Sequence, residues 1–142
     1  MLTGSYNVKL NSGGWIRFPR KLRCEILTDW LIDGFDLIGY KDGDMALFTL
    51  AKPVEGSTYP DVIEVIAGSG DCEIQPSKTE AERMIRHGFD KDNPPPVKLR
   101  IPIGIRRRHL LKPGEELVII GVDSYIEVWR ASDLVKDFQM DE

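Results

Sequence analysis

WIRFPRKLR, residues 15–23, and KLRIPIGIR, residues 98–106, are two versions of one nine-residue pattern. They align without a gap, and three aligned pairs are identical: Arg17 and Arg100, Pro19 and Pro102, and Arg23 and Arg106. Three further pairs are apolar in both copies: Ile16 and Leu99, Phe18 and Ile101, and Leu22 and Ile105. An internal repeat indicates that one structural unit occurs twice in the chain.

Within each copy, a proline separates a strand pattern from a helix pattern. Ile16 and Phe18 lie at alternate positions, which is the period of a strand with one buried face. Pro19 follows directly, and proline does not continue a strand but suits the first turn of a helix. The expected helices are RKLRCEI (20–26) and IGIRRRHLL (103–111).

Further strand patterns flank the two copies. YNVKL (6–10) alternates before the first copy, and residues 11–14 are expected to form the tight turn between these two strands. Apolar runs broken by Asp-Gly or Asp-Ser follow each copy and predict β-hairpins. These are DLIGYKDGDMALFTL (36–50) and ELVIIGVDSYIEVW (116–129), with Gly39 matched to Gly121 and Phe48 placed near Trp129.

The segment between the two copies has a different composition, because residues 51–76 are rich in Pro, Gly, Ser and Asp. Ser77 and Glu80 then have the spacing of a capping box, so a short helix is expected over 78–87. DKDNPPP (90–96) is typical of an extended linker. We expect one compact, β-rich α+β domain with a first repeat (1–53), an irregular insert with that helix and linker (54–96), and a second repeat with an acidic tail (97–142).

The basic residues are unevenly distributed along a chain whose formal net charge is -4. Residues 1–24 and 97–114 contain no acid and carry 11 of the 19 lysines and arginines. The distribution of charge says more than the net charge about whether a surface suits nucleic acid. Each repeat therefore supplies a candidate basic surface.

The sequence does not favour an enzyme. No nucleophile–base pair or metal-ligand cluster is recognisable, and DGD (42–44) is expected to be a hairpin turn. Cys24 and Cys72 lie far apart, and free thiols are favoured over a disulfide. His87 and His109 have no ligand partner at a suitable spacing. We expect no catalytic site, no metal and no cofactor.

The sequence also predicts a location. No apolar run approaches the roughly 18 residues that a membrane-spanning helix needs. The N-terminus lacks a basic segment followed by an apolar stretch, which is the pattern of a signal peptide. We expect a cytoplasmic protein with no membrane partner.

The chain resembles the MraZ family, bacterial regulators of the division and cell-wall gene cluster. The resemblance rests on GSYNVKLNSGGWIRFPRKLR (4–23), KLRIP (98–102), the LLKPGEE turn (110–116) and IIGVDSYIEVW (119–129). It covers nearly the whole chain outside residues 51–90. It implies two tandem AbrB-like swapped-hairpin units with pseudo-two-fold symmetry and short helices.

The resemblance also implies a function. Members of this family are sequence-specific DNA-binding transcription factors that assemble as homo-oligomeric rings, contact repeated promoter sites and need no cofactor. A nucleoid-associated location would follow. Basic residues of both repeats would then contact the phosphates of double-stranded DNA. The candidate residues are Lys9, Arg17, Arg20, Lys21, Lys98, Arg100, Arg107 and Arg108.

The sequence departs from the family in the loop that approaches DNA. The family places Asp-x-x-x-Arg in the turn before the second strand of each unit. Asn11 and Trp15 occupy these positions in the first repeat, and Pro94 and Lys98 occupy them in the second. A second hypothesis is therefore a divergent paralogue that acts as an oligomeric protein-interaction module, with weakened or lost DNA binding.

Individual side chains also have alternative roles. The basic residues could pair with acids of the same or a neighbouring subunit, as most surface charges do. Arg23 and Arg106 could lock the hairpins through a buried carboxylate. Trp15 could stack on a base, although packing against a neighbouring subunit is favoured.

Overall fold

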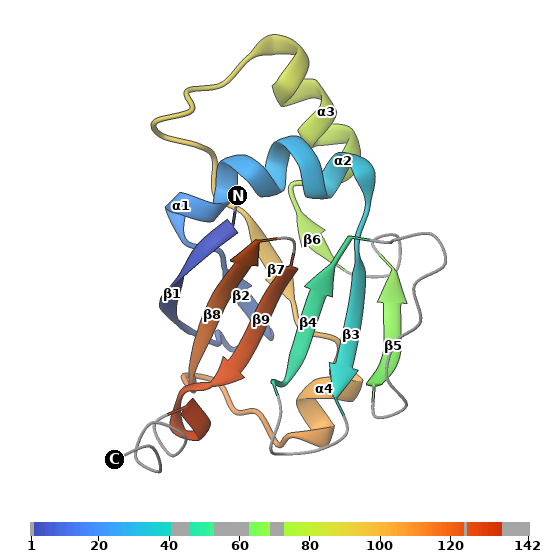
Figure 1. The fold of residues 1–142 in the computed structure, drawn as a ribbon, viewed down its shortest axis with the longest axis vertical. Coiled ribbons are helices and arrows are strands. Elements are labelled where there is room, and N and C mark those ends of the chain that lie inside the picture. Colours follow the sequence, from blue (N-terminus) through green and yellow to red (C-terminus); the bar gives the residue numbers. More distant parts are fainter. Residues whose placement is uncertain (1, 41–45, 53–62, 69–72, 124, 135–142) are drawn as a thin grey trace.

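The computed structural model describes residues 2–40, 46–52, 63–68, 73–123 and 125–134 of the chain. Two antiparallel sheets and a few short helices form an α+β fold, which is the predicted class (Figure 1). The predicted turn at 42–44 and the tail beyond residue 134 lie outside the described residues.

The larger sheet has six strands, and all neighbouring strands are antiparallel. In spatial order these are β1 (Leu2–Lys9), β8 (Glu116–Asp123), β9 (Tyr125–Arg130), β4 (Phe48–Ala51), β3 (Asp36–Tyr40) and β5 (Ile63–Gly68). The two predicted hairpins are confirmed as β3–β4 and β8–β9. β5 comes from the segment expected to be irregular, and its pairing with β3 was not predicted.

The registers of the two hairpins correct one predicted match. Gly39 lies opposite Phe48, and Gly121 lies opposite Ile126. Phe48 therefore corresponds to Ile126, and the match of Phe48 with Trp129 is wrong. The alignment failed because residues 41–47 separate the strands of the first hairpin, whereas a single residue separates those of the second.

The smaller sheet joins the two copies of the repeat. Its strands, in spatial order, are β2 (Trp15–Arg17), β7 (Lys98–Arg100) and β6 (Ile74–Gln75). β2 and β7 are antiparallel, and Ile16 lies opposite Leu99 at the centre of the pair. The predicted alternation places both of these side chains in the core, with no exposed surface.

The predicted turn at residues 11–14 connects β1 to β2. The side-chain oxygen of Asn11 accepts hydrogen bonds of 2.9 Å from the backbone N–H groups of Gly13 and Trp15. Gly14 has φ +85°, and a Cβ there would lie 2.7 Å from the Arg106 guanidinium. Glycine is required at this position by both its conformation and the close approach.

The first helix is longer than the predicted helix over 20–26. It begins after Pro19 as α1 (Arg20–Glu25), continues through a π-helical turn, η1 (Ile26–Trp30), and ends as α2 (Leu31–Asp33). The extension buries Leu27, Trp30 and Leu31, and this tertiary packing sustains the helix beyond its basic start. Gly34, with φ +90°, ends it.

Helices α3 and α4 agree with the predicted helices to different extents. α3 (Lys78–His87) matches the predicted helix, and the Ser77 hydroxyl accepts a 3.2 Å hydrogen bond from the N–H of Glu80. α4 (Ile103–Arg108) is shorter than the predicted 103–111. It ends early because Leu110 turns into the left-handed region, with φ +53°.

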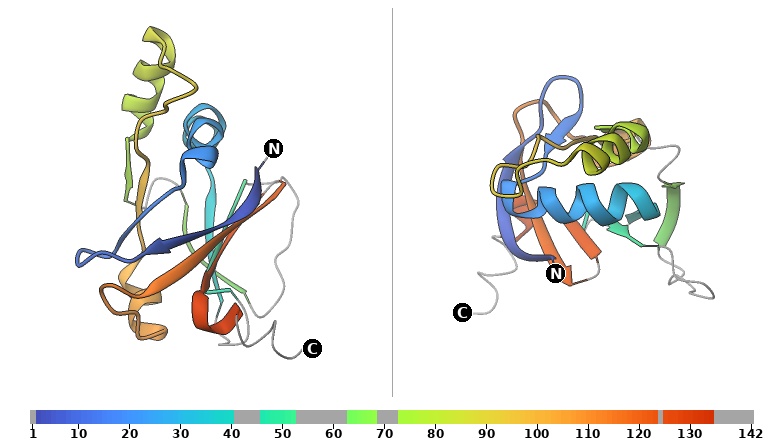
Figure 2. Two further views of the ribbon diagram at one scale, coloured as in Figure 1. Left: turned by 90° about the vertical axis from the view of Figure 1, so that its left-hand side faces the viewer. Right: turned by 90° about the horizontal axis from the view of Figure 1, so that it is seen from above.

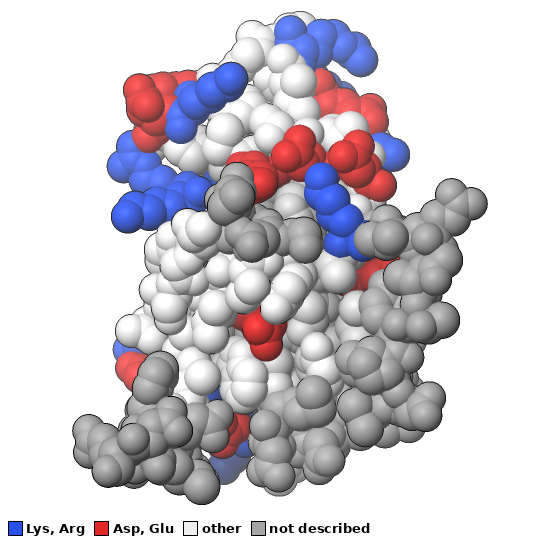
Figure 3. All heavy atoms as spheres, viewed as in Figure 1, with Lys and Arg blue, Asp and Glu red and all other residues white. Residues whose placement is uncertain are grey.

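The two sheets lie face to face, with helices at the ends of the space between them. In the left view of Figure 2, the α1–α2 segment lies at the upper end and α4 at the lower end. On the outer face of the six-stranded sheet, the described atoms over β8, β9 and β4 are mostly uncharged (Figure 3). Lys and Arg on this side gather instead toward the end that carries α1 and α3.

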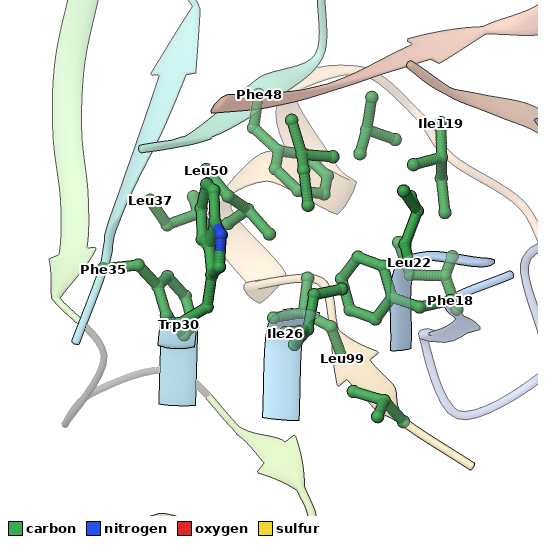
Figure 4. Close-up of a cluster of buried hydrophobic side chains, with 14 of the residues drawn as sticks. Phe18, Leu22, Ile26, Trp30, Phe35, Leu37, Phe48, Leu50, Leu99 and Ile119 are labelled. Carbon is green, nitrogen blue, oxygen red and sulfur yellow. The ribbon is translucent and has the colours of Figure 1, made fainter. Parts of the chain in front are cut away.

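One apolar core fills the space between the sheets (Figure 4). It draws on both repeats and on the long first helix: Phe18, Leu22, Ile26, Trp30, Phe35, Leu37, Phe48, Leu50, Leu99 and Ile119 all point into it. Burying such side chains contributes roughly 1.5–3 kcal/mol each. The core thereby fixes which face of β2 and β7 remains outside.

Candidate nucleic-acid interface

Matching hydrogen bonds hold the two ends of the β2–β7 pair. The N–H of Phe18 donates to the carbonyl of Val97, and the N–H of Ile101 donates to the carbonyl of Gly14, both at 2.9 Å. Each donor and acceptor has its counterpart 83 residues away in the sequence. The seam between the repeats is therefore closed in the same way on both sides.

Arg23 and Arg106 form a second matched pair. The Nε of Arg23 donates to the carbonyl of Phe18, and the Nε of Arg106 donates to the carbonyl of Ile101, both at 2.8 Å. Within the described ranges neither arginine forms an ion pair with the buried carboxylate that was one alternative for it; instead, each ties its helix to the strand that precedes it. These two arginines therefore have a structural role within the chain.

Arg17 and Lys98 lie directly opposite each other across β2 and β7. Arg17 is exposed and Lys98 is half-buried, and no carboxylate in the described ranges forms an ion pair with either. Like charges directly opposite across strands are destabilising. This pair therefore forms a positive site that an anion from outside the chain would stabilise.

Arg20 and Lys21 extend this site along the first turn of α1, where both are exposed. The Arg20 guanidinium donates to the carbonyl of Asp92. Burial, and then the charges of Arg17 and Arg20, lower the pKa of Arg23, which indicates that these cations lie close together. We call Arg17, Arg20, Lys21 and Lys98 the seam group.

The remaining candidates lie apart from the seam group. Arg107 and Arg108 are exposed at the end of α4, which lies at the opposite end of the long axis from α3 (Figure 1). We call these two the α4 group. Lys9 is exposed but stands opposite Glu116 in the β1–β8 pair, so an opposite charge is close to it.

Arg100 is already engaged within the chain. Its Nε donates to the carbonyl of Gly13 at 2.9 Å, and a terminal nitrogen lies 3.3 Å from both carboxylate oxygens of Glu73. The side chain is 39 % exposed. Arg100 therefore supports the turn before β2, which the sequence did not predict because Glu73 lies in the irregular segment.

A groove lies beside the seam group and was not predicted from the sequence. It has a volume of about 740 Å³. Its lining is mixed: it includes the charged side chains of Arg17, Lys98 and Glu80, the polar Gln75 and Ser77, and the apolar Ile74, Met84, Pro95 and Pro96. The sequence contains no local signal for this groove, because residues of α3, β6 and the 90–96 linker line it only once they lie beside β7.

Other kinds of site find little support in the described ranges. No group of three or more His, Cys, Asp or Glu side chains there could hold a metal ion. No helix there is long and apolar enough to cross a membrane.

Of the two histidines, His109 contacts the backbone of the first hairpin. Its Nε2 lies 3.1 Å from the carbonyl oxygen of Tyr40, and burial lowers the pKa of His109.

Comparison with known proteins adds no assignment. No family model matches the chain, and none of the curated proteins matches its sequence. The seam group, the α4 group and the groove are therefore the features from which a function must be argued.

Proposed function

We propose that this protein is a sequence-specific, DNA-binding transcriptional regulator of the MraZ type, which contacts promoter repeats as a homo-oligomer in the nucleoid. The observation that carries the proposal is the Arg17–Lys98 pair, two like charges opposite each other on an outward face. Phosphates are the partner that such a pair suits, because cations on a surface release counterions from DNA when they bind. Arg20 and Lys21, in the first turn of α1, would extend this contact to further phosphates of the same DNA strand.

The proposal includes an architecture of two AbrB-like swapped-hairpin units related by a pseudo-two-fold axis. It is supported by the Ile16–Leu99 centre of the β2–β7 pair and by the matched bonds of Arg23 and Arg106. The β4–β9 pair supports it as well, since Phe48 faces Val128 while Leu50 faces Ile126. The strand order of the six-stranded sheet also supports a pseudo-two-fold axis. The positions of β1, β8 and β9 in one half of the sheet mirror those of β5, β3 and β4 in the other half.

A mobility-shift series on the DNA upstream of the protein's own gene tests the proposed activity. We expect a shift at low salt that weakens steeply as salt rises, with a slope of about 0.9 per phosphate contact. Arg17→Gln and Lys98→Gln should each lower that slope by about one. Lys52→Gln is the matched control, because the Lys52 ammonium lies 3.5 Å from the Asp33 carboxylate and outside the seam group. Absence of any shift at low salt would refute the proposal.

A second candidate is an oligomeric protein-interaction module with weakened DNA binding. Two observations favour it: Asn11 is used to hold its own turn, and Arg100 is tied to Gly13 and Glu73. Both residues therefore work within the chain at positions near the proposed DNA loop. Light scattering after size exclusion would give a stable assembly here too, but without a sequence-dependent mobility shift.

A further inference from the structure

The outward face of the three-stranded sheet carries its side chains in two rows, because residues opposite each other or two positions apart share a face. The first row crosses the strands at Trp15 and Arg100 and ends at Glu73, next to β6. In this row the charge of Arg100 has a partner, since its guanidinium lies 3.3 Å from both carboxylate oxygens of Glu73. The first row therefore shows which group suits an arginine on this face.

The second row has cations but no acid. It consists of Arg17, Lys98 and Gln75, which lie opposite one another on β2, β7 and β6. Arg17 is the repeat counterpart of Arg100, and Gln75 is the β6 member of this row, as Glu73 is the last member of the first row. No carboxylate in the described part of the chain forms an ion pair with Arg17 or Lys98. The second row thus combines two positive charges with a neutral amide.

All three members of the second row line the groove of about 740 Å³. This volume lies within the range of roughly 300–1,000 Å³ that is typical of small-molecule sites. Side chains directly opposite each other start roughly 5 Å apart, so one anionic group can contact both Arg17 and Lys98. The half-buried Ile74, Met84 and Pro95 line the same groove and offer apolar surface to the rest of such a ligand.

Glu80 restricts the charge of the occupant. Its side chain also lines the groove, yet it forms no ion pair with Arg17 or Lys98. A second negative charge on a ligand would be repelled by this carboxylate, and such repulsion is a common source of specificity. The lining therefore favours a ligand with one negative charge and an apolar body.

We infer that this groove is a binding site for a small amphipathic carboxylate. The ligand's carboxylate contacts Arg17 and Lys98, in the way that Glu73 contacts Arg100, and its apolar body lies on Ile74 and Met84. Charge-assisted hydrogen bonds of this kind are among the strongest that a surface site can offer.

A bound carboxylate would also regulate the proposed activity. Arg17 and Lys98 are the pair that carries the proposed DNA contact, so the ligand and a DNA phosphate compete for the same two cations. By linkage, the carboxylate weakens DNA binding by the same factor by which DNA weakens carboxylate binding. This consequence rests on the proposed function, whereas the binding site itself does not.

Octanoate is a suitable probe, because it joins one carboxylate to an apolar chain. Titration of the full chain, followed by heteronuclear NMR, should give saturable shifts of the backbone amides of Gln75 and Lys98. Acetate has the charge without the chain, and octanol has the chain without the charge. Each should bind at least about tenfold more weakly than octanoate. Octanol that binds as tightly as octanoate would overturn the inference.

Gln75→Glu is the sharpest variant. It gives the second row an internal carboxylate at an exposed position, so the melting temperature should stay the same or rise while octanoate binding weakens by about tenfold or more. Arg17→Gln removes one of the two cations and should cause a loss of similar size. Arg86→Gln is the matched control. It removes one positive charge from an exposed position of α3 that does not line the groove, and the dissociation constant should stay within about twofold.

The outcomes separate this inference from the proposed function. Octanoate that does not saturate the protein, or that binds Gln75→Glu and Arg17→Gln as well as the unchanged protein, would overturn the site. In the mobility-shift series, saturating octanoate should weaken DNA binding by about tenfold, whereas acetate at the same concentration should not. A shift indifferent to bound octanoate would overturn the competition. Absence of any shift would overturn the proposed function alone, because the titration of the free protein still decides the site.

Discussion

Leu27 and Leu110 stand eight residues after the proline of their respective repeats, yet they have opposite environments. Leu27 has no exposed surface, whereas Leu110 is 76 % exposed. Both helices begin in the same way, with a proline before the first turn and an arginine bonded back to the strand. The difference is that the first helix continues inward and the second ends at the surface.

The residues that follow explain the divergence. After Leu27 come Trp30 and Leu31, both buried, so extending the helix adds apolar area to the core. After Leu110 comes Pro113, which disfavours the helical conformation of the residue before it. The same beginning is thus followed by a buried helix in the first copy and by a helix that ends at the surface in the second.

The largest expected effect concerns these two leucines. Leu27→Ala should lower the free energy of unfolding by about 2–5 kcal/mol, because it leaves a cavity in a packed core. Leu110→Ala should change it by less than about 0.5 kcal/mol, as for most exposed positions. Urea denaturation of both variants measures the contrast. Similar losses would mean that Leu110 is buried in solution.

The two matched arginines should behave alike. Arg23→Met and Arg106→Met keep the length of the side chain but remove the donor to a strand carbonyl, and each should cost about 1.5–3 kcal/mol. Chemical denaturation is again the measurement, with Arg107→Met as an exposed neighbour that should be nearly neutral. Loss from only one of the pair would show that the matched hydrogen bonds are not equivalent in strength.

Gly34, at the end of the first helix, and Gly104, within α4, differ in whether their backbone conformation requires glycine. Gly34 ends the first helix with φ +90° and ψ 162°, a conformation that is essentially restricted to glycine, so Gly34→Ala should cost about 1–3 kcal/mol. Gly104 lies within α4, and a Cβ there would meet nothing within 4 Å. Gly104→Ala should therefore stabilise the protein by about 0.5–1 kcal/mol. Melting temperatures should move in opposite directions, and a shared direction would contradict the assigned conformations.

The smallest effect concerns pH. His109 corresponds in the repeat to Ile26, which is buried. Burial is the largest cause and lowers the pKa of His109; the hydrogen bond with the Tyr40 carbonyl, next in size, raises it, and the charges of Arg108 and Arg130 lower it again, against a small raising effect of Asp133. The unfolded chain, with a histidine pKa of about 6.5, then binds the proton more readily than the folded chain.

Stability should therefore fall as the pH drops below about 6.5, and should be fully present above it. Urea midpoints across this range measure the dependence. His109→Gln should show a flatter profile than the unchanged protein, whereas His87→Gln, at an exposed position, should not. A profile that His109→Gln leaves unaltered would assign the pH dependence to other groups.

Much of the fold could be predicted because its signals are local. Alternation identified β2 and β7, turn residues identified both hairpins, and the Ser77 cap identified α3. The pairing of β5 with β3 could not be predicted. The position of β5 depends on its backbone hydrogen bonds to the edge of the sheet at β3, and the local sequence does not encode that contact. The extension of α1 through η1 depended likewise on buried contacts that no local pattern contains.

The candidate site likewise has features that could be predicted from local sequence and features that could not. The repeat correctly placed Arg17 outside and Ile16 inside, because a strand has a fixed period. It could not indicate that Lys98 would face Arg17, which depends on the register between distant strands. Nor could it separate Arg100 from the exposed cations, because Glu73 reaches it only through the packing of β6.

The pairing of β1 has a consequence for how the chain is made. Among the described strands β1 pairs only with β8, although more than a hundred residues separate Lys9 from Glu116. During synthesis β1 leaves the ribosome well before β8 and cannot form this pair until β8 follows. Contacts of such long sequence separation slow folding, and an unpaired strand edge invites pairing with another nascent chain. On a polysome, where neighbouring chains emerge side by side, β1 is therefore a segment that needs protection until β8 has been made.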